Sequence, residues 1–126
     1  MKRFIVSLFL LLIIAATYIA ELSIIDKKYD SVSREIKLIE QSAAQNDFEG
    51  MKIAAEKLSK KWKKDETVFT LFITHSSVDE ITCGISRLSA LSTEETAAEF
   101  RSELECIKAG LHHIRENEKP RITNIF

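Results

Sequence analysis

The chain has 126 residues and a formal net charge of −1, so it can form one small domain and lacks the positive charge of a general nucleic-acid binder. One proline and three glycines leave few turn signals, and the abundance of Ala, Leu, Ile, Glu, Lys and Ser favours helices over a β-rich fold. Two cysteines are too few for the disulfide framework of a small secreted scaffold.

The first predicted element is an apolar segment at the N-terminus. Residues 4–20 are almost wholly apolar, and after Glu21 the apolar character continues to residue 25. A bilayer core of about 30 Å needs about 20 apolar residues in a helix, so the segment is long enough to cross it. Because Lys2 and Arg3 precede the segment, the positive-inside rule places the N-terminus in the cytoplasm and the rest of the chain outside.

A cleaved signal peptide is the alternative to an uncleaved anchor, since its basic start would look the same. The cleavage sites fit less well, because a small residue is wanted three residues before the cut. Cleavage after Ala20 would put Tyr18 there, and cleavage after Ala16 would put Ile14 there. We therefore expect a transmembrane signal-anchor helix over residues 1–25 of a single-pass cell-membrane protein, with an extracytoplasmic C-terminal domain.

From residue 22 onward, apolar residues recur at alternating spacings of three and four, which is typical of amphipathic helices. The first stripe begins inside the apolar segment, so we expect the helix to leave the membrane without a break. It ends at residues 45–47, where Asn46 or Asp47 can cap the next helix. The second stripe runs from Phe48 to Trp62 and then loses register, although a helix that continues through this point is the alternative.

The third stripe runs from Val68 to Leu91 and predicts a helix over that range. Residues 92–95, Ser-Thr-Glu-Glu, then form the clearest boundary signal in the chain. They fit a capping box, in which the Ser92 hydroxyl accepts from the helix and the Glu95 side chain reaches back. We expect the fourth helix to begin there.

The fourth stripe runs from Ala97 to Ile114, and its helix is expected to end before Pro120. Four amphipathic helices with short connections predict an all-α fold, in which a transmembrane helix continues into an antiparallel up-down-up-down bundle. The bundle is expected over residues 26–118, with a C-terminal tail over residues 119–126.

The lengths of the first two helices predict which residues return to the bilayer. The first helix runs about 20 residues, or ~30 Å, away from the membrane, and the second returns about 16 residues, or ~24 Å. Lysines at the end of the second helix can attract anionic headgroups, and a tryptophan there can lie in the interface; alternatively the tryptophan caps the core above a solvated lysine rim. The descending tail either contacts lipid or a membrane protein, or closes the bundle. The predicted partner or membrane surface comprises Lys60, Lys61, Trp62, Lys63, Lys64, Ile122, Asn124, Ile125 and Phe126.

The histidines and cysteines give only weak signals for chemistry. His75 falls near the level of His112 and His113, but those two point about 100° apart on a helix, so core or rim histidines are expected rather than a metal site. Cys83 and Cys106 are offset by ~7 Å along the axes, so we expect free thiols packed as small hydrophobes, with a bridge between staggered helices as the alternative. No catalytic, cofactor-binding or metal-binding residue is predicted.

Three features of the sequence resemble the bacterial domain-of-unknown-function 4363 family. They are the helical segment that ends at Trp62, His75 followed by Val-Asp-Glu-Ile at residues 78–81, and the terminal Asn-Ile-Phe at residues 124–126. The similarity spans the whole chain and includes the N-terminal apolar anchor. It implies a cell-envelope location in spore-forming or related bacteria and a neighbouring integral membrane partner, and it assigns no catalytic residue.

We therefore expect a membrane-anchored, non-enzymatic extracytoplasmic helical protein that serves as an accessory or interaction module of the bacterial cell envelope. Its expected partners are the bilayer and an integral membrane protein, with no nucleic acid and no cofactor; the oligomeric state stays open. The alternative is an extracytoplasmic small-ligand-binding or sensor bundle, because the helices of a bundle can hold a ligand between them.

Overall fold

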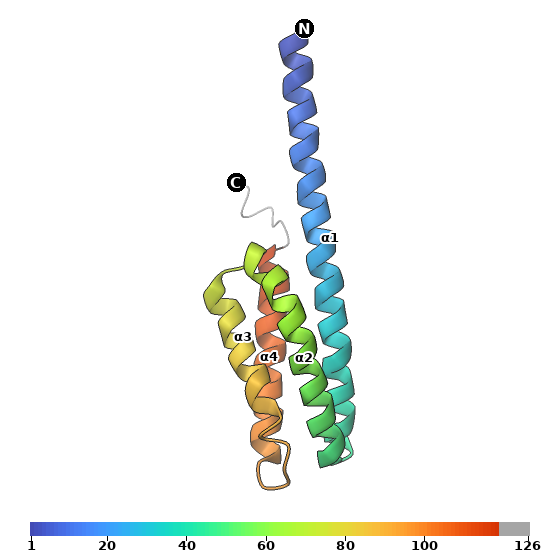
Figure 1. Ribbon diagram of the computed structural model, residues 1–126, viewed down its shortest axis with the longest axis vertical. Coiled ribbons are helices and arrows are strands. Elements are labelled where there is room, and N and C mark those ends of the chain that lie inside the picture. The colour runs from blue at the N-terminus through green and yellow to red at the C-terminus, as the bar shows by residue number, and fades with distance from the viewer. Residues whose placement is uncertain (119–126) are drawn as a thin grey trace.

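Four helices pack antiparallel, and the first projects far beyond the other three (Figure 1). The computed structural model describes residues 1–118, and the predicted tail over residues 119–126 lies outside them. The predicted all-α antiparallel architecture is confirmed. The helices are α1 Lys2–Ala44, α2 Phe48–Phe72, α3 His75–Leu88 and α4 Ala97–Glu118.

α1 is one uninterrupted helix of 43 residues. Side chains in its N-terminal half are exposed, as at Phe4, which is 71% exposed. From Ile25 onward the inward stripe is buried, except at Tyr29, which is partly buried. Among the described residues, α1 is the one helix long and apolar enough to cross a membrane, a property that an N-terminal signal sequence shares. The prediction of an unbroken helix through this region is confirmed.

The turn between α1 and α2 is set by two residues. Asn46 adopts a left-handed backbone conformation with φ 53°, which Asn tolerates better than most residues. The Asp47 side chain accepts a hydrogen bond from the Gly50 backbone N–H at 3.0 Å, so Asp47 is the predicted N-cap of α2. A Cβ at position 50 would lie 2.2 Å from the Asp47 carboxylate, which explains the glycine there.

α2 continues ten residues beyond Trp62, so the continuous helix is correct and the prediction of a third helix from Val68 is wrong. The stripe does not lose register at this point. Asp65 occupies the next inward position, followed by Phe69, and both are buried. The register break was inferred because a carboxylate stands where an apolar residue was expected.

The predicted capping box at residues 92–95 is also wrong, since α4 begins only at Ala97. Ser92 is buried, and its hydroxyl donates to the Leu88 carbonyl at 3.0 Å, so it completes the end of α3 instead. The Thr93 hydroxyl oxygen accepts the Thr96 backbone N–H at 3.3 Å in the turn that leads into α4.

Apolar side chains from all four helices form one continuous core. The α4 stripe from Phe100 to Ile114 is buried as predicted, and its first member, Ala97, is only partly buried. His75 falls within the range predicted for the third helix, but it is exposed at the start of α3. The largest fully buried side chains are Trp62, Phe69, Phe100, Ile39, Met51, Leu58, Ile85, Leu88, Leu111, Val32 and Val78.

A pair of substitutions tests the extension of α2. Phe69 is fully buried, so Phe69→Ala should lower the free energy of unfolding by about 3–5 kcal/mol. Leu71 lies on the same turn and is 72% exposed, so Leu71→Ala should change stability by less than about 0.5 kcal/mol. Denaturant unfolding of the full chain in micelles, followed by helical circular dichroism, measures both; equal effects would contradict the assignment of residues 65–72 to α2.

Candidate functional site

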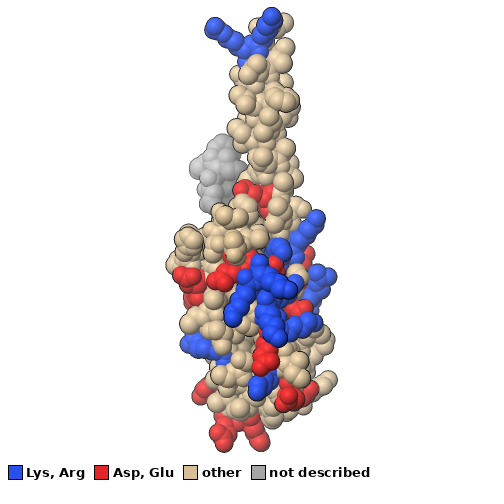
Figure 2. All heavy atoms as spheres, in the orientation of Figure 1, with Lys and Arg blue, Asp and Glu red and all other residues tan. Residues whose placement is uncertain are grey.

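Four lysines share one face of α2 at a helical spacing of three, one and three. They line a shallow hollow of about 270 Å³ together with Glu35 of α1. Figure 2 shows Lys and Arg gathered at mid-height on one side of the bundle. We call this surface the basic face, and it comprises Lys57, Lys60, Lys61 and Lys64.

Half of the charge on the basic face is paired within the molecule. The Lys57 ammonium lies 3.3 Å from a Glu35 carboxylate oxygen, and the Lys61 ammonium lies 4.0 Å from Asp65 Oδ2. Among residues 1–118, no ion-pair partner is present for Lys60 or Lys64, and both side chains are exposed. These two ammonium groups are therefore available to an anionic group from outside.

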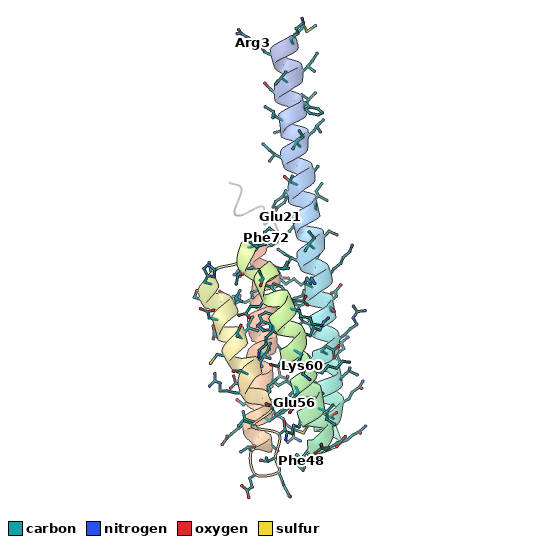
Figure 3. All side chains as sticks on the ribbon, viewed as in Figure 1. Arg3, Glu21, Phe48, Glu56, Lys60 and Phe72 are labelled. Carbon is teal, nitrogen blue, oxygen red and sulfur yellow. The ribbon has the colours of Figure 1, made fainter. Side chains whose placement is uncertain are left out.

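The basic face lies on the side of the bundle rather than at the end beside the apolar half of α1, where the lysines were predicted. Figure 3 places Lys60 midway along α2, and the helix runs a further twelve residues to Phe72. At 1.5 Å per residue this is ~18 Å. The end of α2 that lies beside the apolar half of α1 is therefore formed by residues 67–72, and not by the lysines.

Trp62 belongs to the core, so its predicted place on a partner or membrane surface is wrong. Its side chain is 1% exposed, and its ring stacks on Phe69 with 5.1 Å between centroids. The indole Nε1–H donates to the Thr82 hydroxyl oxygen at 2.7 Å. The Thr82 oxygen also lies 3.0 Å from Glu66 Oε1 and from the Val78 carbonyl, so its single hydrogen can be donated to either.

Asp65 has the most buried side chain of any ion-pair partner among the described residues. Its side chain is 6% exposed, and its Oδ1 accepts from the Lys28 ammonium at 2.6 Å. The second oxygen, Oδ2, has no hydrogen-bond partner there. A buried carboxylate is costly unless its partner is in place, so the pair fixes the height at which α1 and α2 meet. The sequence signal was a charged residue at an inward position of the stripe.

A groove of about 440 Å³ runs between α1 and α4, with apolar walls that include Tyr29, Ile36 and Leu111. The Lys108 ammonium closes one edge by donating to Glu40 and, at 2.9 Å, to Glu105. These hydrogen bonds, the one to Glu40 most of all, raise the pKa of Lys108 above its usual value of 10.5. If the protein binds a small ligand, the alternative raised by the sequence, this groove on the surface is where the ligand would fit, and not the packed core.

The titratable residues singled out in the sequence are dispersed. His75, His112 and His113 are all exposed, and within residues 1–118 no group of three His, Cys, Asp or Glu side chains could hold a metal ion. Cys83 and Cys106 are unbonded and exposed, so the prediction that they pack as small hydrophobes is wrong. Each lies next to a buried residue, Cys83 beside Gly84 and Cys106 beside Ile107.

The predicted tail residues Ile122, Asn124, Ile125 and Phe126 lie outside the described residues. Their expected contact with lipid or a membrane protein therefore stays a prediction.

An N-terminal apolar helix continued into an antiparallel four-helix bundle defines a class of small α-helical proteins with a possible membrane anchor or signal helix. The chain belongs to the family described as "Domain of unknown function (DUF4363)", which it matches over residues 19–125. No curated protein and no solved structure matches the chain. The family match begins near the end of the apolar segment and includes the whole bundle, in agreement with the resemblance seen in the sequence.

The role of the Lys28–Asp65 pair can be tested by removing one or both partners. Lys28→Ala should destabilise the chain by about 2 kcal/mol, less than the 3–5 kcal/mol of a fully buried pair, because the Lys28 side chain is 38% exposed. Replacing both partners, Lys28→Met with Asp65→Leu, should recover stability to within about 1 kcal/mol of the wild type. Denaturant unfolding in micelles measures each variant.

Lys27 provides the matched control, because it is exposed and neighbours Lys28 on the same helix. Lys27→Ala should change the free energy of unfolding by less than about 0.5 kcal/mol. A loss from Lys28→Ala no greater than that from Lys27→Ala would show that the pair does not set the register.

Proposed function

We propose that this protein is a membrane-anchored, non-enzymatic accessory module of the bacterial cell envelope, which docks on an integral membrane protein. In this proposal α1 is an uncleaved single-pass anchor with its N-terminus in the cytoplasm, and the bundle lies on the extracytoplasmic side. The observation that carries the proposal is the uninterrupted passage of α1 from an exposed apolar half into the packed bundle.

The apolar half of α1 supports membrane insertion. No charged residue lies between Arg3 and Glu21, and the side chains in between are exposed to an unusual degree for large apolar groups. A helix satisfies its own backbone hydrogen bonds, so lipid can surround this half without leaving polar groups unpaired. The hydroxyls of Ser7 and Thr17 donate to carbonyls of their own helix, at 2.9 and 2.8 Å, and carry no unsatisfied polarity into the bilayer.

The rigid connection supports docking from the side. Because α1 is straight and continuous (Figure 1), an anchored bundle would stand upright on the bilayer and offer its side faces to neighbours in the same membrane. The basic face is one of these sides, and Lys60 and Lys64 supply charge there that is unpaired within residues 1–118. An acidic extracytoplasmic segment of a membrane protein is the partner that such a surface would attract.

The buried polar groups of the described core have structural roles. The described core contains two buried polar side chains, Asp65 and Ser92. Asp65 is held by Lys28, and the Ser92 hydroxyl donates to a helix carbonyl, so both have structural partners. The tail residues Ile122, Asn124, Ile125 and Phe126 remain part of the proposed docking surface on sequence grounds.

In-cell photo-crosslinking from position 56 tests the docking proposal. Glu56 is exposed on α2 beside the basic face, so a photoreactive residue there should form an adduct with an integral membrane protein. The double change Lys60→Glu and Lys64→Glu should lower the adduct yield about tenfold, which corresponds to about 1.4 kcal/mol of lost attraction.

The matched control is Lys37→Glu with Lys52→Glu, which changes the net charge equally at exposed lysines outside the basic face. This control should leave the adduct unchanged. An adduct that both pairs of substitutions reduce to the same extent, or no adduct with a membrane protein at all, would contradict the proposal.

A further inference from the structure

The segment that joins α2 to α3 has no charged residues. Residues 67–78, which we call the α2–α3 turn, contain no Asp, Glu, Lys or Arg, although 29% of the chain is charged. This is the longest uncharged stretch after the apolar segment of α1. It comprises the last turn and a half of α2, the short connection at Ile73 and Thr74, and the first turn of α3.

The apolar side chains of this connection are not all buried. Leu71 is 72% exposed, about as much as Phe4 in the apolar half of α1. Phe72 and Ile73 are partly buried against the core, so they hold the turn to the bundle while Leu71 projects from it. Single exposed apolar side chains are common on protein surfaces, so what distinguishes Leu71 is its place within twelve consecutive uncharged residues.

The register of the bundle places this turn beside the end of the apolar segment. Lys28 meets Asp65, and α2 runs antiparallel to α1, so seven residues onward along α2 correspond to seven residues back along α1. Phe72 is therefore level with Glu21, and Figure 3 shows the two at neighbouring heights.

The outer boundary of the bilayer core is expected at the same height along α1 as this turn. A hydrocarbon core that begins after Arg3 and is about 30 Å thick takes up about 20 residues of α1, and so ends close to Ser23. The α2–α3 turn then lies at the boundary between the outer headgroups and the hydrocarbon. Thr, Ser and His side chains around Leu71 suit that boundary better than charges would.

We propose that the α2–α3 turn inserts Leu71 into the outer leaflet and is a second membrane contact of the bundle. This inference rests on the membrane anchoring proposed above. The partner that contacts the turn is the lipid of the outer leaflet. The span alone would let the bundle rotate about α1. A second contact removes this freedom, so the basic face keeps a constant direction in the plane of the membrane.

The experiment uses the full chain in lipid nanodiscs, with Cys83 and Cys106 replaced by serine. An environment-sensitive NBD fluorophore is attached after Leu71→Cys, and in a second sample after Ile53→Cys. Ile53 is the matched control, because it is 59% exposed on the same helix and lies ~27 Å farther from the membrane end. Quenching by nitroxide-labelled lipids and by aqueous iodide is measured for both samples.

We expect the label at position 71 to be quenched by the nitroxide lipids and to be at least threefold less accessible to iodide than the label at position 53. Equal iodide quenching at the two positions, in chains that co-elute with the discs, would overturn the inserted turn and leave the anchor intact. Protection from iodide without quenching by lipid would indicate a cover of protein, and would also overturn the inference. A chain that does not co-elute with the discs would overturn the anchor, and the inserted turn with it.

Discussion

A single unbroken ladder of backbone hydrogen bonds carries α1 from its apolar half into the bundle, and the rest of the structure depends on it. α2 and α4 pack against the C-terminal half of α1, and α3 packs on α2 and α4, so the N-terminal half of α1 projects with its apolar side chains uncovered. At 1.5 Å per residue, the 43 residues extend ~65 Å, which is more than twice the thickness of a bilayer core. The helix is therefore long enough to span a membrane and still provide one full side of a bundle.

The Lys28–Asp65 pair determines where the other surfaces of the bundle lie along α1. It fixes how far α2 rises along α1, and so it places the uncharged α2–α3 turn beside Glu21 and the basic face on the side of the bundle. Both proposed contacts follow from that register. A bundle of the same helices shifted by one turn along α1 would move each surface by ~5.4 Å relative to the apolar half of α1.

Much of the fold could be predicted from the sequence because the apolar residues follow the helical period. The inward stripes of α1 and α4 were identified nearly residue by residue, and Asp47 was recognised as a cap. The errors arose where a residue type departs from its usual role. Asp65 is a carboxylate at a core position, which hid the continuation of α2, and Ser92 bonds back to α3 instead of capping α4.

The candidate site was less predictable, because it depends on where the helices end. The lysines were singled out by their charge, but their expected position at the bilayer surface followed from an α2 that was taken as ten residues too short. Trp62 was assigned to the surface for the same reason, whereas the full helix buries it against Phe69 and Thr82. The groove between α1 and α4 has no local signal at all, since its walls come from residues far apart in the chain.

The most direct test of the account is the distance between two spin labels on α1, one in the apolar half and one in the bundle. Labels at Ser7→Cys and Arg34→Cys, in a chain whose native cysteines are replaced by serine, lie 27 residues apart on exposed positions. Double electron–electron resonance in nanodiscs should give a narrow distance distribution centred at about 40 Å, which is the length of a straight helix between the two positions. A broad or clearly shorter distribution, or a mature chain from which position 7 has been removed, would contradict an unbroken anchor.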